Sequence, residues 1–212
     1  MQAQVFSLYW DNVEESIVSG QRAVFDCFGL PISQHRIHGL PHGEWMDWVV
    51  KRFNAVDVFL FIDIDCVPLA KSAIEEAVKS AANGHLHGAA QAAAHIDNSR
   101  IYAGPFFLAV SATTLKHIGY PSAVPDTFHD VAQRWTEAAV VGAVPVEVLM
   151  PSSVEVPRWT LPNGLAFGIG TNYEDRIYHL FESRASTEAA RFHRVVNAIT
   201  AQQRFSPLAA VS

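Results

Sequence analysis

A short apolar run that ends in two aspartates constrains the fold more than any other feature of the sequence. Residues 57–65 read DVFLFIDID. Such a continuous run suits a central strand covered on both faces, whereas a half-exposed strand would alternate apolar and polar residues. An ionised carboxylate at the edge of a core is costly unless something compensates its charge. Asp63 and Asp65 therefore indicate a ligand or solvent at the end of this strand.

Strand and helix patterns alternate through the first 84 residues. The apolar residues at positions 46, 49, 50 and 53, for example, have the spacing of an amphipathic helix. The predicted strands cover residues 4–9, 32–39 and 57–65, and the predicted helices cover residues 13–28, 43–54 and the segment between Pro68 and Asn83. This order predicts an α/β fold with a parallel sheet. The aspartate pair then lies at the carboxyl end of the third strand, where open α/β sheets bind ligands.

The second half of the chain is less regular. Strands are predicted over residues 87–96, 101–111 and 144–150, and helices over residues 127–140 and 186–203. Residues 151–170 are rich in Pro, Gly, Ser and Asn. We therefore expect a long loop there, of a length usually tied to binding or to a lid.

Composition excludes several classes of protein. The chain is about half hydrophobic, which suits one globular domain over residues 1–212. The formal net charge of −6 argues against a nucleic-acid binder that relies on a basic face. Cys27 and Cys66 do not suggest a disulfide scaffold. No apolar run approaches the roughly 20 residues that span a bilayer, and the sequence has no basic leader, so we expect a cytoplasmic protein without a transmembrane segment.

The aspartate pair suits a hard divalent cation. Pro68, three residues after Asp65, favours an end of the strand near the pair, where both carboxylates can reach one ligand. Two close carboxylates repel each other unless a cation lies between them, and Mg²⁺ or Mn²⁺ prefers such oxygen ligands. The simpler alternative is that one aspartate caps a loop and the other is solvated.

In its setting of strands and helices, the pair resembles the D-x-D motif of GT-A-type glycosyltransferases. In that family the motif ends a strand and holds a metal on the diphosphate of a nucleotide sugar. Residues 102–119, YAGPFFLAVSATTLKHIG, resemble the strand and short helix that follow it. The segment PDTFHDVAQRW resembles the loop that supplies an aspartate, with Asp130 the best match and Asp126 the alternative. His179 lies where such families often have a metal-binding histidine.

The resemblance implies a GT-A-like, Rossmann-like fold, with a mixed, mostly parallel central sheet flanked by helices. Residues 1–84 would form the nucleotide-binding half, residues 85–185 the acceptor and sugar half, and residues 186–212 a C-terminal helix and tail. The implied activity is that of a hexosyltransferase. It would transfer a sugar from a nucleoside-diphosphate sugar to an acceptor hydroxyl that the sequence does not identify.

The resemblance also assigns roles to single residues. Asp63, Asp65 and His179 would bind Mn²⁺ or Mg²⁺. Asp130 would orient the sugar or act as base on the acceptor hydroxyl, although the start of a helix favours an aspartate for its own sake. Donor contacts would come from Tyr9, Asp11, Asn12, Ile64, Gly104, Arg158 and Arg176.

Some of these donor contacts have simpler explanations. Asp11 and Asn12 fit an ordinary turn equally well. Arg158, Arg176 and Arg184 flank the predicted loop and suit a diphosphate, but at least one of them is expected to be a solvated surface residue. Residues 157–176 would close over the donor and exclude water.

Two other functions remain open from the sequence. DIDCV also fits the pattern of haloacid-dehalogenase-like phosphatases, in which Asp63 would be the nucleophile. A non-catalytic nucleotide- or sugar-binding domain is the further alternative. The remaining close histidines match no common zinc spacing, so we expect them at the surface or in loops: His35, His38, His42, His85 and His87.

Overall fold

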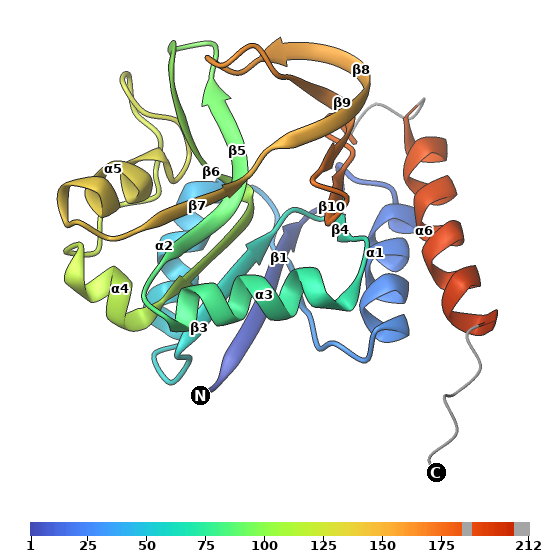
Figure 1. Ribbon diagram of the computed structural model, residues 1–212. Helices are drawn as coiled ribbons and strands as arrows, with labels where there is room; N and C mark the ends of the chain where they lie inside the picture. Colours follow the sequence, from blue (N-terminus) through green and yellow to red (C-terminus); the bar gives the residue numbers. More distant parts are fainter. Residues whose placement is uncertain (184–187, 206–212) are drawn as a thin grey trace.

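The computed structural model describes residues 1–183 and 188–205 and contains two β-sheets (Figure 1). In spatial order, the larger sheet consists of β2 (Ser33–Arg36), β1 (Ala3–Tyr9), β3 (Val58–Ile62), β6 (Asp97–Ser111), β5 (Leu86–Ala93) and β7 (Val146–Leu149). The smaller sheet consists of β4 (Cys66–Pro68), β10 (Ile177–His179), β9 (Ala166–Tyr173) and β8 (Pro151–Thr160). The helices are α1 (Glu15–Cys27), α2 (His42–Arg52), α3 (Lys71–Ala82), α4 (Ala112–His117), α5 (Gln133–Val141) and α6 (Ala189–Phe205).

The larger sheet is mixed and mostly parallel, as predicted. Strand β1 runs parallel to β2 and β3, and β5 runs parallel to β7. Only β6 is antiparallel to its two neighbours, β3 and β5. It follows β5 through a short turn, and a connection of that length joins only antiparallel strands.

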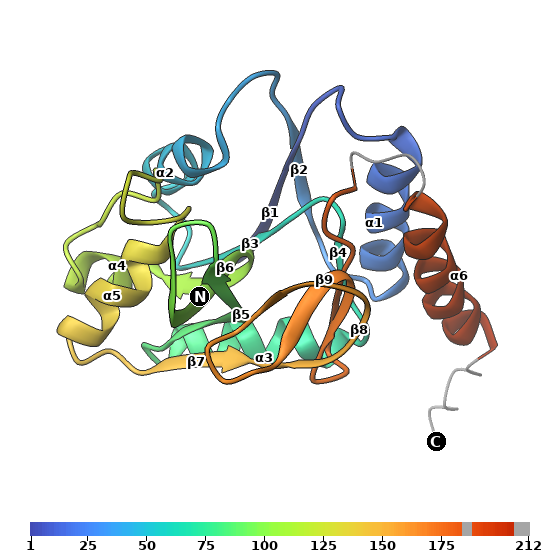
Figure 2. The same ribbon diagram turned by 90° about the horizontal axis from the view of Figure 1, so that it is seen from above.

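The central strand β3 is buried on both faces. Val58, Leu60 and Ile62 pack into a core shared with α1 and α3. Phe59 and Phe61 point the other way, into a core shared with α2, α4 and α5. Figure 2 shows these three helices together on one side of the sheet and α3 on the other. The continuous apolar sequence of the strand is explained by these two layers.

Most predicted elements of the first half are confirmed, with ends that differ by a few residues. Gly29 and Gly84 follow α1 and α3 with φ of +64° and +89°, the left-handed conformation that ends many helices. The two strands predicted over 87–96 and 101–111 form the β5–β6 hairpin. The C-terminal helix is confirmed as α6, which lies beside α1 in both views (Figures 1 and 2). Its predicted first residues, 186 and 187, lie outside the described residues.

The predicted loop at residues 151–170 is wrong, because most of this segment forms strands β8 and β9. Along β8 the pattern alternates: Val154 and Val156 are partly buried, whereas Ser153, Glu155 and Pro157 are exposed. Alternation of this kind is typical of a strand with one face on a core. The lid that the sequence predicted over residues 157–176 is therefore a paired hairpin.

Proline and glycine have specific places in this hairpin. Strand β8 is at the edge of the smaller sheet, where a residue without an N–H group is tolerated at Pro157. The pairing shifts by one residue between Pro157 and Trp159, which is a bulge. Beside the bulge, a Cβ at Gly168 would lie 2.5 Å from the carbonyl oxygen of Val156. The glycine allows the two backbones to approach each other.

Helix α5 starts later than the predicted residue 127. The Asp126 side chain accepts hydrogen bonds from the N–H groups of Phe128 and His129, each at 2.8 Å. These bonds hold a turn that competes with a helix. Ala132 has a φ of +57°, and the helix begins only after it.

None of the described helices is both long and apolar enough to cross a membrane. The cytoplasmic location expected from the sequence stays a prediction.

Phe61 tests the packing of the larger sheet on its helices. Its ring contacts Trp45 of α2 and Trp135 of α5, with centroid distances of 5.5 and 5.8 Å. We expect Phe61→Ala to lower the free energy of unfolding by about 3–5 kcal/mol, because the resulting cavity is enclosed. Phe128→Ala is the matched control, since Phe128 is 74% exposed and Phe61 is 0% exposed. Denaturant unfolding of both variants measures the difference, and equally small shifts would contradict this packing.

Candidate metal and nucleotide site

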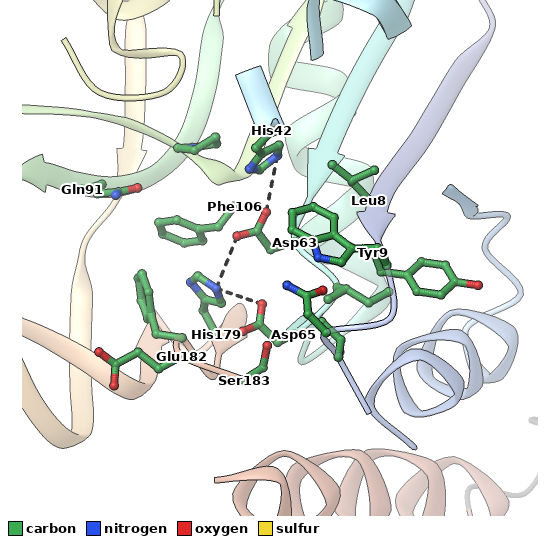
Figure 3. Close-up of a pocket in the computed structure, with 16 residues that line it drawn as sticks. Leu8, Tyr9, His42, Asp63, Asp65, Gln91, Phe106, His179, Glu182 and Ser183 are labelled. Carbon is green, nitrogen blue, oxygen red and sulfur yellow. Dashed lines mark hydrogen bonds and ion pairs between the residues drawn. The ribbon is translucent and has the colours of Figure 1, made fainter. Parts of the chain in front are cut away.

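Two carboxylates and an imidazole converge beyond the end of β3. Asp63 directly follows β3, Asp65 directly precedes β4, and His179 is the last residue of β10. Antiparallel pairing places His179 opposite Cys66, next to Asp65. One ligand atom of each of the three side chains lies within 4.8 Å of the others. Figure 3 shows the three side chains pointing toward one another.

The distances and burial of this group suit a cation. His179 Nε2 lies 3.2 Å from Asp65 Oδ1 and 3.8 Å from Asp63 Oδ2. Burial raises the pKa of Asp65, but the charge of His179 and the hydrogen bonds from His179 and Ser183 outweigh it and hold that pKa below its ordinary value. Asp65 is therefore ionised at neutral pH. Two carboxylate oxygens and one imidazole nitrogen form a donor set that divalent metals accept.

Aromatic rings fix the orientation of His179. Its ring stacks on Phe106 at a centroid distance of 4.3 Å and contacts Phe181 at 3.7 Å. Because these rings cover it, the His179 side chain is only 3% exposed. Its Nε2 atom is directed at the two carboxylates (Figure 3).

A buried glutamine holds the turn that carries the aspartates. Gln21 of α1 donates hydrogen bonds from Nε2 to the carbonyl oxygens of Asp63, at 2.6 Å, and Cys66, at 2.9 Å. Gln21 Oε1 accepts a hydrogen bond from Gln34 Nε2 at 3.0 Å. The Asp63 N–H group also donates to the Phe106 carbonyl oxygen at 3.0 Å. The backbone of the D-x-D turn is thus fixed from two sides.

The three side chains lie in a cleft of about 650 Å³. Its lining residues are Leu8, Tyr9, Trp10, Asn12, Val13, His42, Asp63, Ile64, Asp65, Gln91, Pro105, Phe106, His179, Phe181, Glu182 and Ser183. Of the predicted donor contacts, the cleft brings Tyr9, Asn12 and Ile64 together with the three predicted metal ligands.

Other predicted site residues do not line the cleft. Asp11 forms an exposed ion pair with Arg36 at 2.6 Å. The carboxylate of Asp130 accepts a hydrogen bond from Tyr102 Oη at 2.8 Å. Gly104 lies within β6, covered by neighbouring side chains. The role of Asp130 as a catalytic base stays a prediction.

The arginines predicted to contact the donor do not line the cleft in the described part of the chain. Arg158 is exposed and lies 3.8 Å from Glu182, which itself lines the cleft. Arg176 is ion-paired with Glu76 of α3. Arg184 lies outside the described residues. Contact of these arginines with a diphosphate stays a prediction.

The sequence did not point to ten of the lining residues, and two of the polar ones among them are His42 and Gln91. His42, expected at the surface or in a loop, begins α2 with its Nε2 atom 3.5 Å from Asp63 Oδ1. His42 lies a few residues after the second parallel strand, as the aspartates lie after the third. This position beyond the carboxyl end of a parallel strand was the sequence feature that indicated a site residue. Gln91 is the one polar residue within the run AAQAAA, a pattern that marks a polar group inside a core. The surface expectation is also wrong for His87, which is buried.

Unpaired polar atoms are concentrated in this cleft. Among the described residues, seven buried side-chain nitrogen or oxygen atoms make no hydrogen bond. Four of them belong to residues that line the cleft: Asn12 Oδ1, His42 Nε2, Gln91 Oε1 and His179 Nδ1. Buried polar atoms are nearly always paired in folded proteins. These atoms lie under the surface of the cleft walls, and His42 Nε2 is also within 3.5 Å of Asp63 Oδ1, so their concentration marks unmet hydrogen-bonding capacity around the cleft.

No protein-family model and no curated protein matches the chain. Among solved structures, it is similar to a glycosyltransferase involved in the glycosylation of the major capsid of PBCV-1, with 13% identity, 90% of this chain and 100% of that chain covered, and a TM-score of 0.50. It is also similar to A197 from STIV (10% identity, 78% and 93% covered, TM-score 0.49). A third similar structure is a Drosophila β-1,4-galactosyltransferase 7 mutant in complex with manganese, UDP-Gal and xylobiose (12% identity, 92% and 74% covered, TM-score 0.46). The likeness to the PBCV-1 enzyme shows the fold, and the predicted GT-A-like architecture is confirmed.

Gln21 tests how the D-x-D turn is held. Gln21→Met preserves the length of the side chain but removes its hydrogen bonds to the Asp63 and Cys66 carbonyl oxygens. We expect the free energy of unfolding to fall by about 1–3 kcal/mol, because buried polar groups lose their partners. Gln202→Met, at an exposed position of α6, is the control. An unfolding curve for Gln21→Met that overlays those of the wild type and the control would refute the role of this glutamine.

Proposed function

We propose that this protein is a metal-dependent glycosyltransferase that transfers a sugar, as a hexosyltransferase, from a nucleoside-diphosphate sugar to an acceptor hydroxyl. The observation that carries the proposal is the convergence of Asp63, Asp65 and His179 at the carboxyl end of β3. It occurs on a fold shared with a glycosyltransferase and within a cleft large enough for a sugar nucleotide.

The side chains fit a divalent cation in both charge and chemistry. Asp63 and Asp65 supply oxygen ligands, and His179 supplies a nitrogen ligand that aromatic packing aims at them. A bound Mn²⁺ or Mg²⁺ would neutralise the charge that develops on the departing diphosphate. With the Asp65 carboxylate already ionised, the site needs no proton loss from that residue before it accepts a cation.

Other residues of the cleft are placed to bind the remaining parts of the donor. Tyr9 ends the first strand and lies on the side of the metal site away from Gln91 (Figure 3). Asn12 follows it in the chain and lines the same cleft, and we assign both residues to the nucleoside. This matches the proposed division into a nucleotide half at 1–84 and a sugar and acceptor half at 85–185. In the transfer, the bond between the sugar C1 and the diphosphate oxygen breaks. A bond from the acceptor oxygen to C1 forms, and the acceptor proton passes to a base, for which Asp130 is the predicted group.

A thermal-shift panel tests the proposed donor class. UDP-, GDP-, CMP- and dTDP-sugars are each added with and without Mn²⁺. We expect the melting temperature to rise for at least one nucleotide sugar only when Mn²⁺ is present, because ligand binding to the folded state stabilises it. A panel with no metal-dependent shift would contradict the proposed function. Turnover of a generic phosphate ester that depends on Asp63 would instead indicate a phosphatase.

Asp65→Asn tests the metal site directly. It removes a charged ligand, so we expect metal-dependent binding of the selected nucleoside diphosphate to weaken on the order of 100-fold or more. The variant should still fold, since asparagine has nearly the same shape. Calorimetric titration with and without Mn²⁺ measures the loss. Asp26→Asn, at an exposed position of α1, is the control, and affinity that survives in Asp65→Asn would rule out the metal site.

A further inference from the structure

A polar side chain that none of the roles above uses lies at one end of the cleft. Gln91, on β5, lines the cleft, and its Oε1 atom is buried without a hydrogen bond among the described residues. Leaving a buried acceptor unpaired costs about 1–3 kcal/mol. The oxygen lies under the wall of the cleft, against Gly104, so the amide nitrogen is the atom of this side chain that a ligand in the cleft can reach.

Gly104 provides the space that this amide occupies. A Cβ at position 104 would lie 2.6 Å from Gln91 Oε1 and 2.5 Å from Phe106 Cε1. Either contact is far shorter than a van der Waals separation, so any larger residue would displace both neighbours. The missing side chain at Gly104 therefore keeps the Gln91 amide and the Phe106 ring in the same wall of the cleft. This is a role for Gly104 other than the direct donor contact predicted from the sequence.

The order of strands gives the position of Gln91 along the cleft. Tyr9 ends β1, the aspartates follow β3, and Gln91 lies on β5, with β6 between β3 and β5. Two strand spacings, roughly 10 Å, separate β3 from β5. Figure 3 shows the same order in space, with Asp63, Asp65 and His179 between Tyr9 and Gln91. A nucleotide sugar whose diphosphate lies at the aspartates and whose nucleoside lies at β1 extends its sugar toward β5.

From this placement we propose that Gln91 is a specificity-determining residue for the transferred sugar, with its amide N–H group donating a hydrogen bond to a sugar hydroxyl. The inference rests on the proposed function and extends it to the sugar. Phe181, which is partly exposed, lines the same cleft and offers apolar surface to the C–H face of the ring. An amide in this position distinguishes sugars by the presence and orientation of one hydroxyl, because a sugar without it leaves the amide N–H group without that partner.

Gln91→Met tests this contact, since methionine keeps the side-chain length and removes the amide. The probes are UDP and UDP-galactose with Mn²⁺, or the diphosphate and sugar nucleotide of whichever base the thermal-shift panel selects. Calorimetry gives the ratio of the Kd for the diphosphate to the Kd for the sugar nucleotide. We expect this ratio to fall roughly three- to ten-fold in Gln91→Met, with the Kd for the diphosphate unchanged. Gln202→Met, the same substitution at an exposed site, should leave both values unchanged.

Each other outcome overturns the inference. An unchanged ratio with unchanged affinities shows that Gln91 does not contact the sugar, while the proposed function stands. Equal losses for the diphosphate and the sugar nucleotide show that the substitution disturbed the cleft and not one sugar contact. If the wild-type protein binds neither probe with Mn²⁺, the proposed function fails and the sugar contact fails with it.

Discussion

The pairing of β4 with β10 is the contact on which the candidate site depends. Each strand has three residues, yet the pairing joins segments of the chain that are more than 100 positions apart. It places His179 opposite Cys66 and lets the Leu180 N–H group donate to the Asp65 carbonyl oxygen at 3.0 Å. Without this pairing, the two aspartates would be two carboxylates at a strand end, which is a common and unremarkable arrangement.

The charges of the two aspartates constrain which groups can surround this pairing. Asp63 and Asp65 bring two negative charges to the edge of a core, where a charge is costly to hold. His179 Nε2 lies on one side of the Asp63 carboxylate, at 3.8 Å, and His42 Nε2 lies on the other, at 3.5 Å. Burial and the charges of both aspartates raise the pKa of the Cys66 thiol well above its ordinary value, so that thiol stays neutral. The negative charge is therefore concentrated on the two carboxylates.

Local sequence patterns predicted the larger sheet well because its elements carry their own signals. The apolar run of β3 and the helical spacing in α2 are properties of adjacent residues, and packing on both faces of the sheet reinforced them. The placement of Asp63 and Asp65 followed from a general property of parallel sheets. His179 came only from the family resemblance, since no local pattern in its segment indicates a neighbour on β4.

The smaller sheet was not predictable by the same means. Strands β4 and β10 are too short for periodicity to be detected, and their pairing partners are far away in the chain. In β8 and β9 the alternation was present, but proline and glycine suggested a loop. Those residues belong there because β8 is an edge strand with a bulge beside Gly168. The predicted start of α5 was wrong for a similar reason. The hydrogen bonds from backbone N–H groups to the Asp126 side chain leave no sign in the spacing of apolar residues.

The edge position of β8 has a consequence for how copies of this protein behave in a crowded solution. An unpaired strand edge presents N–H and C=O groups that another chain can pair with, which is a route to aggregation. Along β8, Pro157 has no N–H group to offer, and the bulge next to it twists the backbone out of register. Arg158, which is exposed, adds charge next to the bulge. These features make the β8 edge a poor template for pairing with a second chain.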